Sequence, residues 1–453
     1  MKKLRCTSLL LALIFAASAF ACSSGGIFSA KNEKVSSTDA PFAAPTGHTS
    51  TAAPSTSAPY EPGMTWHEVY DPNTDFDNRF GRGDIGVVET EEAYYFQPID
   101  PAGGYLYYYD KLCDDCGVLC PRPECMHTDD SCNARLHARA GTLSCANNRL
   151  YYMVENDGPR SDELSRAACY SVALDGTDRR REFKMPCERE DSAYTLQLHR
   201  GKFYGAGYTN TVINGEIGFH LTVTSWDAKT GEFNRIFSAD RASAYSAPRL
   251  FFFGKYVYFC FDANSVAVAG GGFTTLDVWR CDTETGALEN VFTGEMPGCR
   301  YTLWVESEDR VYVMPTLPNP DVPAAAYLIS GGELSMAYEF GDYGGLALLD
   351  GAFQWYYGRP EKGTIELRLV DFGGNDIYSG SIDLSCIGEA LPGYEFAAYY
   401  GCFGDSRTVI YCVNAEERIS DGSIDCFIRM EFPGGGAQPT VTFLCAAEHS
   451  ASS

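Results

Sequence analysis

Residues 250–262 read LFFFGKYVYFCFD, and residues 276–292 read LDVWRCDTETGALENVF. Each stretch holds two apolar, aromatic-rich runs that are separated by a polar turn marked by glycine. Runs of Tyr, Val and Phe bounded by such turns are typical of β-hairpins, and neither stretch keeps a helical period. The two stretches together predict one antiparallel sheet of four strands.

The same four-stranded unit recurs along the chain. Its second strand carries an aromatic anchor at intervals of 43 to 57 residues, at Tyr94, Tyr151, Tyr204, Tyr258, Tyr312, Trp355 and Tyr411. In most copies the third strand ends in Asp followed by a Gly turn, as at Asp227 and Gly231. About seven such units are typical of a β-propeller, with a sandwich pair or an open solenoid as alternatives. We therefore predict an all-β fold, a propeller of about seven four-stranded blades, over residues 66–453.

Four connections between second and third strands are expected to be long loops, at residues 156–167, 209–218, 263–275 and 316–324. In an antiparallel blade these connections emerge on one face, together with the links between blades. Binding residues are often found on long loops that a rigid scaffold positions. This face is therefore the expected binding surface.

The N-terminus predicts export. Residues 1–21, MKKLRCTSLLLALIFAASAFA, combine a basic start, a short apolar run and a small-residue cleavage site, which is typical of a signal peptide. Cys22 follows at once and is the predicted lipidation site, with ordinary secretion and a free Cys22 as the alternative. Residues 22–65 are rich in Ser, Thr, Pro and Ala and are expected to form a disordered tether. The predicted location is extracytoplasmic, on a lipid anchor in the bacterial cell membrane.

The charge of the chain limits its partners. Its 60 acidic residues against 35 Lys and Arg give a formal net charge of −25. Binding to nucleic acid needs a basic surface, so nucleic acid is excluded as a partner. We expect membrane contact only through the N-terminal lipid, and a monomer.

A Cys-rich loop, residues 113–132, is expected between the first and second blades. Cys120, Cys125, His127 and Cys132 supply three thiolates and one imidazole, enough for a closed tetrahedral zinc site. The alternative is a set of local disulfides that staple the loop, because exported cysteines are usually paired. Cys113 and Cys116 form a C-x-x-C pair that could supply ligands or act in redox chemistry.

Other cysteines fall on neighbouring strands of single blades. These are Cys260 with Cys281, and Cys412 with Cys426. Both cross-strand disulfides and buried free thiols remain open for them.

The residues from Leu106 to Lys111 and from Leu119 to Ala134 (LCPRPECMHTDDSCNA) carry a family resemblance. They resemble a block of propeller-bearing surface lipoproteins of anaerobic, Gram-positive-type bacteria, related to TolB-like and DUF5050-like propellers. The resemblance covers the signal, the tether and the repeats, and it implies a surface-anchored propeller. It implies no reaction, so no catalytic residue is carried over.

Known catalytic motifs are absent from the sequence. There is no Gly-x-Ser-x-Gly, no His-Glu-x-x-His and no Walker loop. Asp71, Asn73, Asp75 and Asp77 have the spacing that starts a calcium loop, but Phe76 stands where the loop needs Gly. A polar turn that enters the first blade is the expected structure there.

We therefore predict a binding module for an envelope, host or dietary ligand, either a protein partner or a polysaccharide. One alternative is a glycan lyase or hydrolase with its site in the propeller channel. The other is a scaffold in an envelope complex. No catalytic residue and no certain cofactor is predicted, and zinc is the candidate metal.

Overall fold

The computed structural model describes residues 70–447 apart from 72, 83–84, 98–103, 128–130, 137–142, 155–163, 187–191, 228, 242–248, 264–271, 342–343, 360–362 and 419–421. The predicted signal peptide (1–21), lipidation site (Cys22) and tether (22–65) lie outside these residues. None of the helices in the described part has the length and hydropathy of a membrane span.

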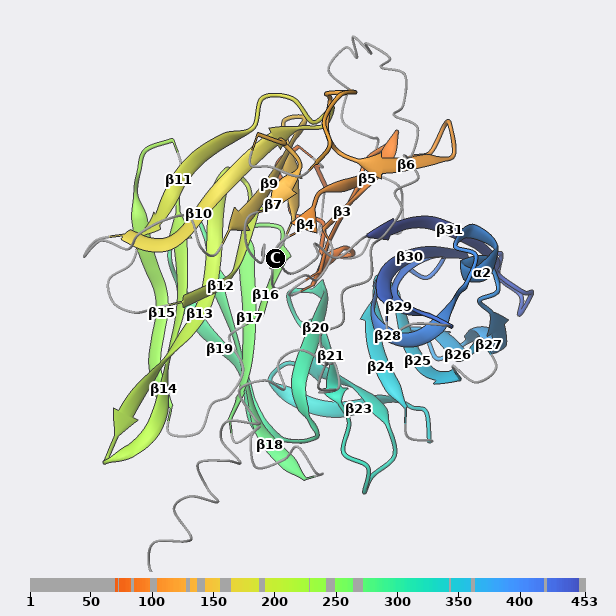
Figure 1. The fold of residues 1–453 in the computed structure, drawn as a ribbon. Coiled ribbons are helices and arrows are strands. Elements are labelled where there is room, and N and C mark those ends of the chain that lie inside the picture. The colour runs from red at the N-terminus through yellow and green to blue at the C-terminus, as the bar shows by residue number, and fades with distance from the viewer. Residues whose placement is uncertain are drawn as a thin grey trace, which may run out of the picture. The chain divides into compact units, whose positions relative to one another are not determined.

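The described chain is a seven-bladed β-propeller, nearly all β, as predicted (Figure 1). Six blades have four antiparallel strands, and the first has an extra short strand, β1. The blades, in chain order, are β1 (Gly81–Arg82), β2 (Ile85–Glu89), β3 (Ala93–Gln97), β5 (Tyr107–Asp110) and β6 (Asp115–Val118); β8 (Ser144–Ala146), β9 (Arg149–Val154), β10 (Leu164–Ala173) and β11 (Arg180–Pro186); β12 (Ser192–His199), β13 (Lys202–Ile213), β14 (Glu216–Trp226) and β15 (Phe233–Arg241); β16 (Arg249–Phe253), β17 (Tyr256–Ala263), β18 (Phe273–Asp282) and β19 (Leu288–Pro297); β20 (Cys299–Ser307), β21 (Arg310–Leu317), β22 (Ala325–Ser330) and β23 (Glu333–Glu339); β24 (Gly345–Leu349), β25 (Ala352–Arg359), β26 (Thr364–Asp371) and β27 (Asp376–Asp383); β28 (Tyr394–Gly404), β29 (Thr408–Glu417), β30 (Ser423–Glu431) and β31 (Thr440–Ala447). Strands β4 (Gly104–Tyr105) and β7 (Arg135–Leu136) pair with each other, and the short helix α2 (Cys386–Ala390) precedes the last blade.

The repeat that predicted the blades has a local physical basis. Every aromatic anchor lies on the second full strand of its blade. The Asp that ends the third strand caps the following turn: Asp227 accepts hydrogen bonds from the Lys229 and Thr230 amides at 2.9 and 3.0 Å. Gly231 then takes φ +76°, a conformation that glycine adopts without a steric penalty.

Each blade packs on its neighbours through both faces of its strands. The buried side chains of the described residues gather in seven clusters, and each cluster joins two adjacent blades. In β3, for example, Tyr95 faces the second blade while Tyr94 and Phe96 face the last. This alternation follows from the period of two along a strand.

The seam between the first and last blades closes the ring. Each of these blades is built from one continuous stretch of chain, so side-chain packing holds the seam together. Phe96 of β3 stacks on Phe427 of β30 with ring centroids 4.4 Å apart, and both rings are fully buried. Figure 1 shows β31, in dark blue, beside the orange first blade.

Residues 73–80, which we call the N-terminal strap, tie several blades together before the chain enters the first blade. The Phe76 amide donates to His199 Nδ1 at 3.1 Å, and His199 Nε2 donates to the Gly254 carbonyl at 2.8 Å. His199 therefore accepts at Nδ1 and carries its proton on Nε2, which is the neutral imidazole. It links the strap to the third and fourth blades.

The strap also reaches the fourth and last blades. The Asn78 side chain exchanges two hydrogen bonds with the Phe252 backbone, at 2.6 and 3.1 Å. The Arg79 carbonyl accepts from the Gly404 amide at 2.9 Å. These contacts fasten the strap to the fourth blade and to the last blade, which adjoins the first.

The structure corrects one expectation and decides between two open alternatives. Residues 209–218 do not form a long loop, because β13 and β14 continue as a hairpin to a two-residue turn at Asn214 and Gly215, both with positive φ. For the cysteines on neighbouring strands, cross-strand disulfides and buried free thiols were both open. The register excludes the disulfides, because it places the two members of each pair on opposite faces of the sheet. Cys412 pairs with Phe427 whereas Cys426 pairs with Val413, and Cys260 is likewise an odd number of rungs from Cys281.

Candidate metal centre

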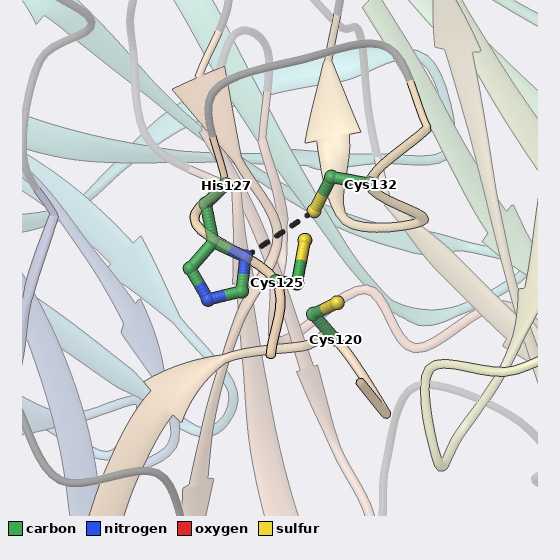
Figure 2. Close-up of side chains that lie close together, drawn as sticks. All are labelled: Cys120, Cys125, His127 and Cys132. Carbon is green, nitrogen blue, oxygen red and sulfur yellow. Dashed lines mark hydrogen bonds between the residues drawn. The ribbon is translucent and has the colours of Figure 1, made fainter. Parts of the chain in front are cut away.

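The structure brings together the four predicted ligands in the Cys-rich loop (Figure 2). Cys120 follows β6, Cys132 precedes β7, and Cys125 and His127 lie between them. Their ligand atoms all lie within 4.8 Å of one another. Cys132 is fully buried, and the other three are partly exposed.

The spacing of the ligand atoms is close to that of a tetrahedral site. With zinc–sulfur bonds of about 2.3 Å and zinc–nitrogen bonds of about 2.0 Å, ligand atoms on the edges of a tetrahedron lie about 3.5 to 3.8 Å apart. His127 Nδ1 lies 3.4 Å from Cys132 Sγ. A small contraction of the cluster would therefore place all four atoms around one ion.

The backbone at His127 is held in an unusual conformation. His127 has φ +56°, in the left-handed region that side chains other than Gly seldom adopt. The Tyr105 hydroxyl donates to the His127 carbonyl, and this bond ties the segment to β4. Such strain persists where the surroundings fix it, and here it accompanies an imidazole that points at three thiols.

Charge and hydrogen bonding affect the groups of the cluster differently. Burial opposes ionisation of Cys125, but hydrogen bonds from the His127 amide and the neighbouring thiols lower its pKa. Burial raises the pKa of Cys132 to about 12 and lowers the pKa of His127, which favours neutral imidazole. Arg122 Nη2 lies 3.4 Å from Cys125 Sγ and supplies the nearby positive charge.

The second blade packs against the loop that carries the cluster. The turn between β10 and β11 packs on the loop so closely that a Cβ on Gly176 would lie 2.7 Å from the Leu119 carbonyl oxygen. Asn133 Nδ2 donates to the Gly176 carbonyl at 2.9 Å, and Arg179 donates to the Cys132 carbonyl at 3.4 Å. These supporting contacts come from distant parts of the chain, and the sequence patterns did not reveal them.

The remaining cysteines lie outside the cluster. Cys113 and Cys116 are both exposed, at the β5–β6 turn and on β6. Within the described residues, the cluster is the one group of three or more His, Cys, Asp or Glu side chains placed to hold a metal ion. Its four ligands form a closed set that can hold a metal and leaves no position for a reacting water.

The residues with calcium-like spacing, Asp71 to Asp77, lead into the strap. Asp75 accepts from Arg200 Nε at 2.7 Å, and Asp77 pairs with Arg79 at 2.8 Å. These carboxylates are neutralised by arginines, and the segment forms the polar turn that the sequence predicts.

A serine, a histidine and an aspartate also meet on the third blade. His220 of β14 lies between Asp240 and Ser238 of β15, with Nδ1 2.6 Å from Asp240 Oδ1 and Nε2 3.2 Å from Ser238 Oγ. The Asp240 side chain is 61% exposed. Water competes for each of these bonds, so the set behaves as a surface network rather than as an activated nucleophile.

Comparison with protein-family models finds no match, and comparison with curated proteins finds none. Solved structures with a similar fold include TolB from Acinetobacter baumannii, with a TM-score of 0.35, 13% identity, and coverage of 79% of this chain and 80% of that one. Another is the β-propeller domain of the trilobed protease from Pyrococcus furiosus, described as having an open velcro topology, with a TM-score of 0.36, 13% identity, and coverage of 67% and 93%.

A third is a puromycin-hydrolyzing peptidase of Mycobacterium tuberculosis, with a TM-score of 0.44, 11% identity, and coverage of 83% of this chain. The chain spans about half (55%) of that peptidase. At these values the similarities support no inference about function.

Proposed function

We propose that this protein is a zinc-containing propeller that acts as a binding module for a partner protein. In this proposal Cys120, Cys125, His127 and Cys132 hold one zinc ion. The observation that carries the metal assignment is the convergence of four ligand atoms within 4.8 Å. Three thiols and one imidazole suit zinc, whose structural sites have this composition.

The proposed role of zinc is structural. All four positions of a tetrahedral ion are taken by side chains, so the ion cannot also bind a substrate. The loop that it would hold has little apolar core of its own, since Leu119 and Cys132 are the buried side chains among the described residues of 113–132. Zinc would fix this loop against the β10–β11 turn of the second blade.

Metal content tests this part of the proposal. The full chain, purified without oxygen, is expected to carry one zinc per molecule. Cys125→Ala should lose it, whereas Cys145→Ala, which removes a thiol of the second blade outside the cluster, should keep it. Blocked thiols with no metal in the native chain would favour the disulfide alternative and overturn the assignment.

The hairpin β13–β14 supports the binding role. Val212 and Ile217 face each other across its tip and are 72% and 63% exposed. Apolar side chains held in the open by an ordered hairpin are available to a partner protein. The acidic charge of the chain makes nucleic acid an unsuitable partner.

A photo-crosslinking residue at Val212 tests this surface in the cells that make the protein. One defined adduct is expected there, and none when the same residue replaces the exposed Met336 of another blade. The double variant Val212→Ser, Ile217→Ser should weaken binding of the identified partner at least tenfold. Equal adducts at both sites, or unchanged affinity, would refute the assignment.

The anchor remains part of the proposal. Processing after Ala21 and acylation of Cys22 with palmitate-type chains would place the propeller outside the cytoplasm, on the bacterial cell membrane. Cys22→Ala should release the protein from the membrane fraction. Retention of that variant in the membrane would contradict lipid anchoring.

A further inference from the structure

The seam between the first and last blades brings two cysteines together. Cys116 lies on β6, the outermost strand of the first blade, and Cys445 lies on β31, the outermost strand of the last. Strands β6 and β31 contact each other, and the two thiols lie close enough to affect each other's ionisation. They are 329 residues apart in the chain, and the closed ring makes them neighbours.

Strand register explains why both side chains point into the seam. Cys116 pairs with Tyr109, so it shares a face with that residue. Tyr109 packs against the last blade, in the same cluster as Leu444 and Cys445. The alternation of a strand therefore directs Cys116 toward the last blade and not toward the second.

The two thiols differ in their exposure to solvent. Cys116 is exposed, whereas Cys445 is 1% exposed. The hydrogen bond from Cys445 lowers the pKa of Cys116, and the same bond together with burial raises the pKa of Cys445. An accessible thiol that ionises readily thus sits against a buried partner, which is the arrangement of an attacking and a resolving cysteine.

We propose that Cys116 and Cys445 form a disulfide bond that closes the propeller ring covalently. Apart from the contacts of the strap with the last blade, the seam is held by packing, such as that of Phe96 on Phe427. A bond at this position would link the two ends of the ring without changing the strand order. It would be a redox-dependent modification site, separate from the cluster at Cys120–Cys132.

The oxidant is a low-molecular-weight or protein disulfide. The Cys116 thiolate attacks one sulfur of that disulfide, breaks its S–S bond and releases one thiolate. The Cys445 sulfur then attacks the mixed disulfide, forms the Cys116–Cys445 bond and releases the second thiolate. Two protons and two electrons leave the protein, and the oxidant leaves as two thiols.

Peptide mapping of the full chain tests the bond. The zinc-loaded protein is equilibrated in mixtures of reduced and oxidised glutathione, quenched in acid, alkylated and digested. A linked peptide pair containing Cys116 and Cys445 is expected, in a fraction that rises with oxidised glutathione. Recovery of Cys116 joined to Cys113, or of both thiols alkylated at every ratio, would overturn the proposal.

Variants give a second readout on non-reducing gels. Closing so large a loop makes the denatured chain compact, so the oxidised protein should migrate faster. Cys116→Ala, at an exposed position, and Cys445→Ala should abolish this shift. Cys113→Ala should keep it, as should Cys412→Ala, a buried thiol of the same cluster. A shift that persists in Cys116→Ala would refute the pairing.

Thermal unfolding gives a third readout of the proposed disulfide bond. Oxidation is expected to raise the apparent Tm of the native chain by about 4 °C. The Tm of Cys116→Ala should not respond to the glutathione ratio. An equal response of both proteins would show that some other thiol is responsible.

Discussion

The stability of the propeller should depend on pH through His199, which joins the N-terminal strap to two blades. In the folded protein its Nδ1 accepts the Phe76 amide and its Nε2 donates to the Gly254 carbonyl. Protonation would place a hydrogen on Nδ1, against the Phe76 N–H. Burial lowers the pKa of His199 to about 4, although the Gly254 carbonyl and Asp75, 3.9 Å away, act in the opposite direction.

The sign and size follow from proton linkage. The unfolded chain has a His pKa of about 6.5 and therefore binds more protons than the folded protein between pH 6.5 and 4. The contribution of His199 is fully present above pH 6.5 and is lost as the pH falls toward 4. Between pH 7 and pH 5 this loss amounts to about 2 kcal/mol of the free energy of unfolding.

Urea unfolding of the zinc-loaded protein at several pH values measures this loss. Other acidic groups also titrate, so the informative quantity is the difference between the native protein and His199→Gln. The variant should be less stable at pH 7 but should lose about 2 kcal/mol less on going to pH 5. His220→Gln, which removes a histidine from the surface network, is the matched control. Parallel pH curves for the native protein and His199→Gln would refute the reasoning.

Three further experiments test the packing and the site. Gly176→Ala should cost about 1–3 kcal/mol and speed zinc loss to a chelator, because the new Cβ meets Leu119 at a position with φ +79°. Gly231→Ala, at the equivalent turn with φ +76° and open space around it, should leave zinc retention unchanged, and equal zinc loss from both would contradict the docking of the loop. Phe427→Ala at the ring seam should destabilise the fold by about 3–5 kcal/mol in urea unfolding, whereas Phe273→Ala at an exposed position should cost far less; similar costs would argue against the seam. A fluorophosphonate probe should not label the native protein at Ser238, and labelling that Ser238→Ala abolishes would instead make the His220 network a nucleophilic site.

The blades could be predicted because their signals are local. An aromatic anchor such as Tyr258 and an Asp-capped turn such as that at Asp227 lie within a few residues of the hairpins they define. The grouping of Cys120, Cys125, His127 and Cys132 could be predicted for the same reason, because the four residues lie in a short stretch of chain. Spacing alone predicted which four side chains the fold brings together, but not the contacts that support them.

Features that depend on register or on distant contacts were missed. The Asn214-Gly215 pair is a strong hairpin signal, and it forms the turn of a continuous hairpin where a loop was expected. The sequence left a disulfide between Cys412 and Cys426 open, and only the register excludes it, because one rung separates the two faces of a strand. The approach of Cys116 to Cys445 depends on closure of the whole ring, which no local pattern reports.

X-ray absorption at the zinc edge of the full chain tests the metal centre most directly. We expect one zinc per chain, with three sulfur neighbours at about 2.3 Å and one nitrogen at about 2.0 Å. His127→Ala should remove the nitrogen contribution or the metal itself. A zinc ion surrounded by oxygen, or protein purified without oxygen in which Cys120, Cys125 and Cys132 are held in disulfides and no metal is bound, would contradict it.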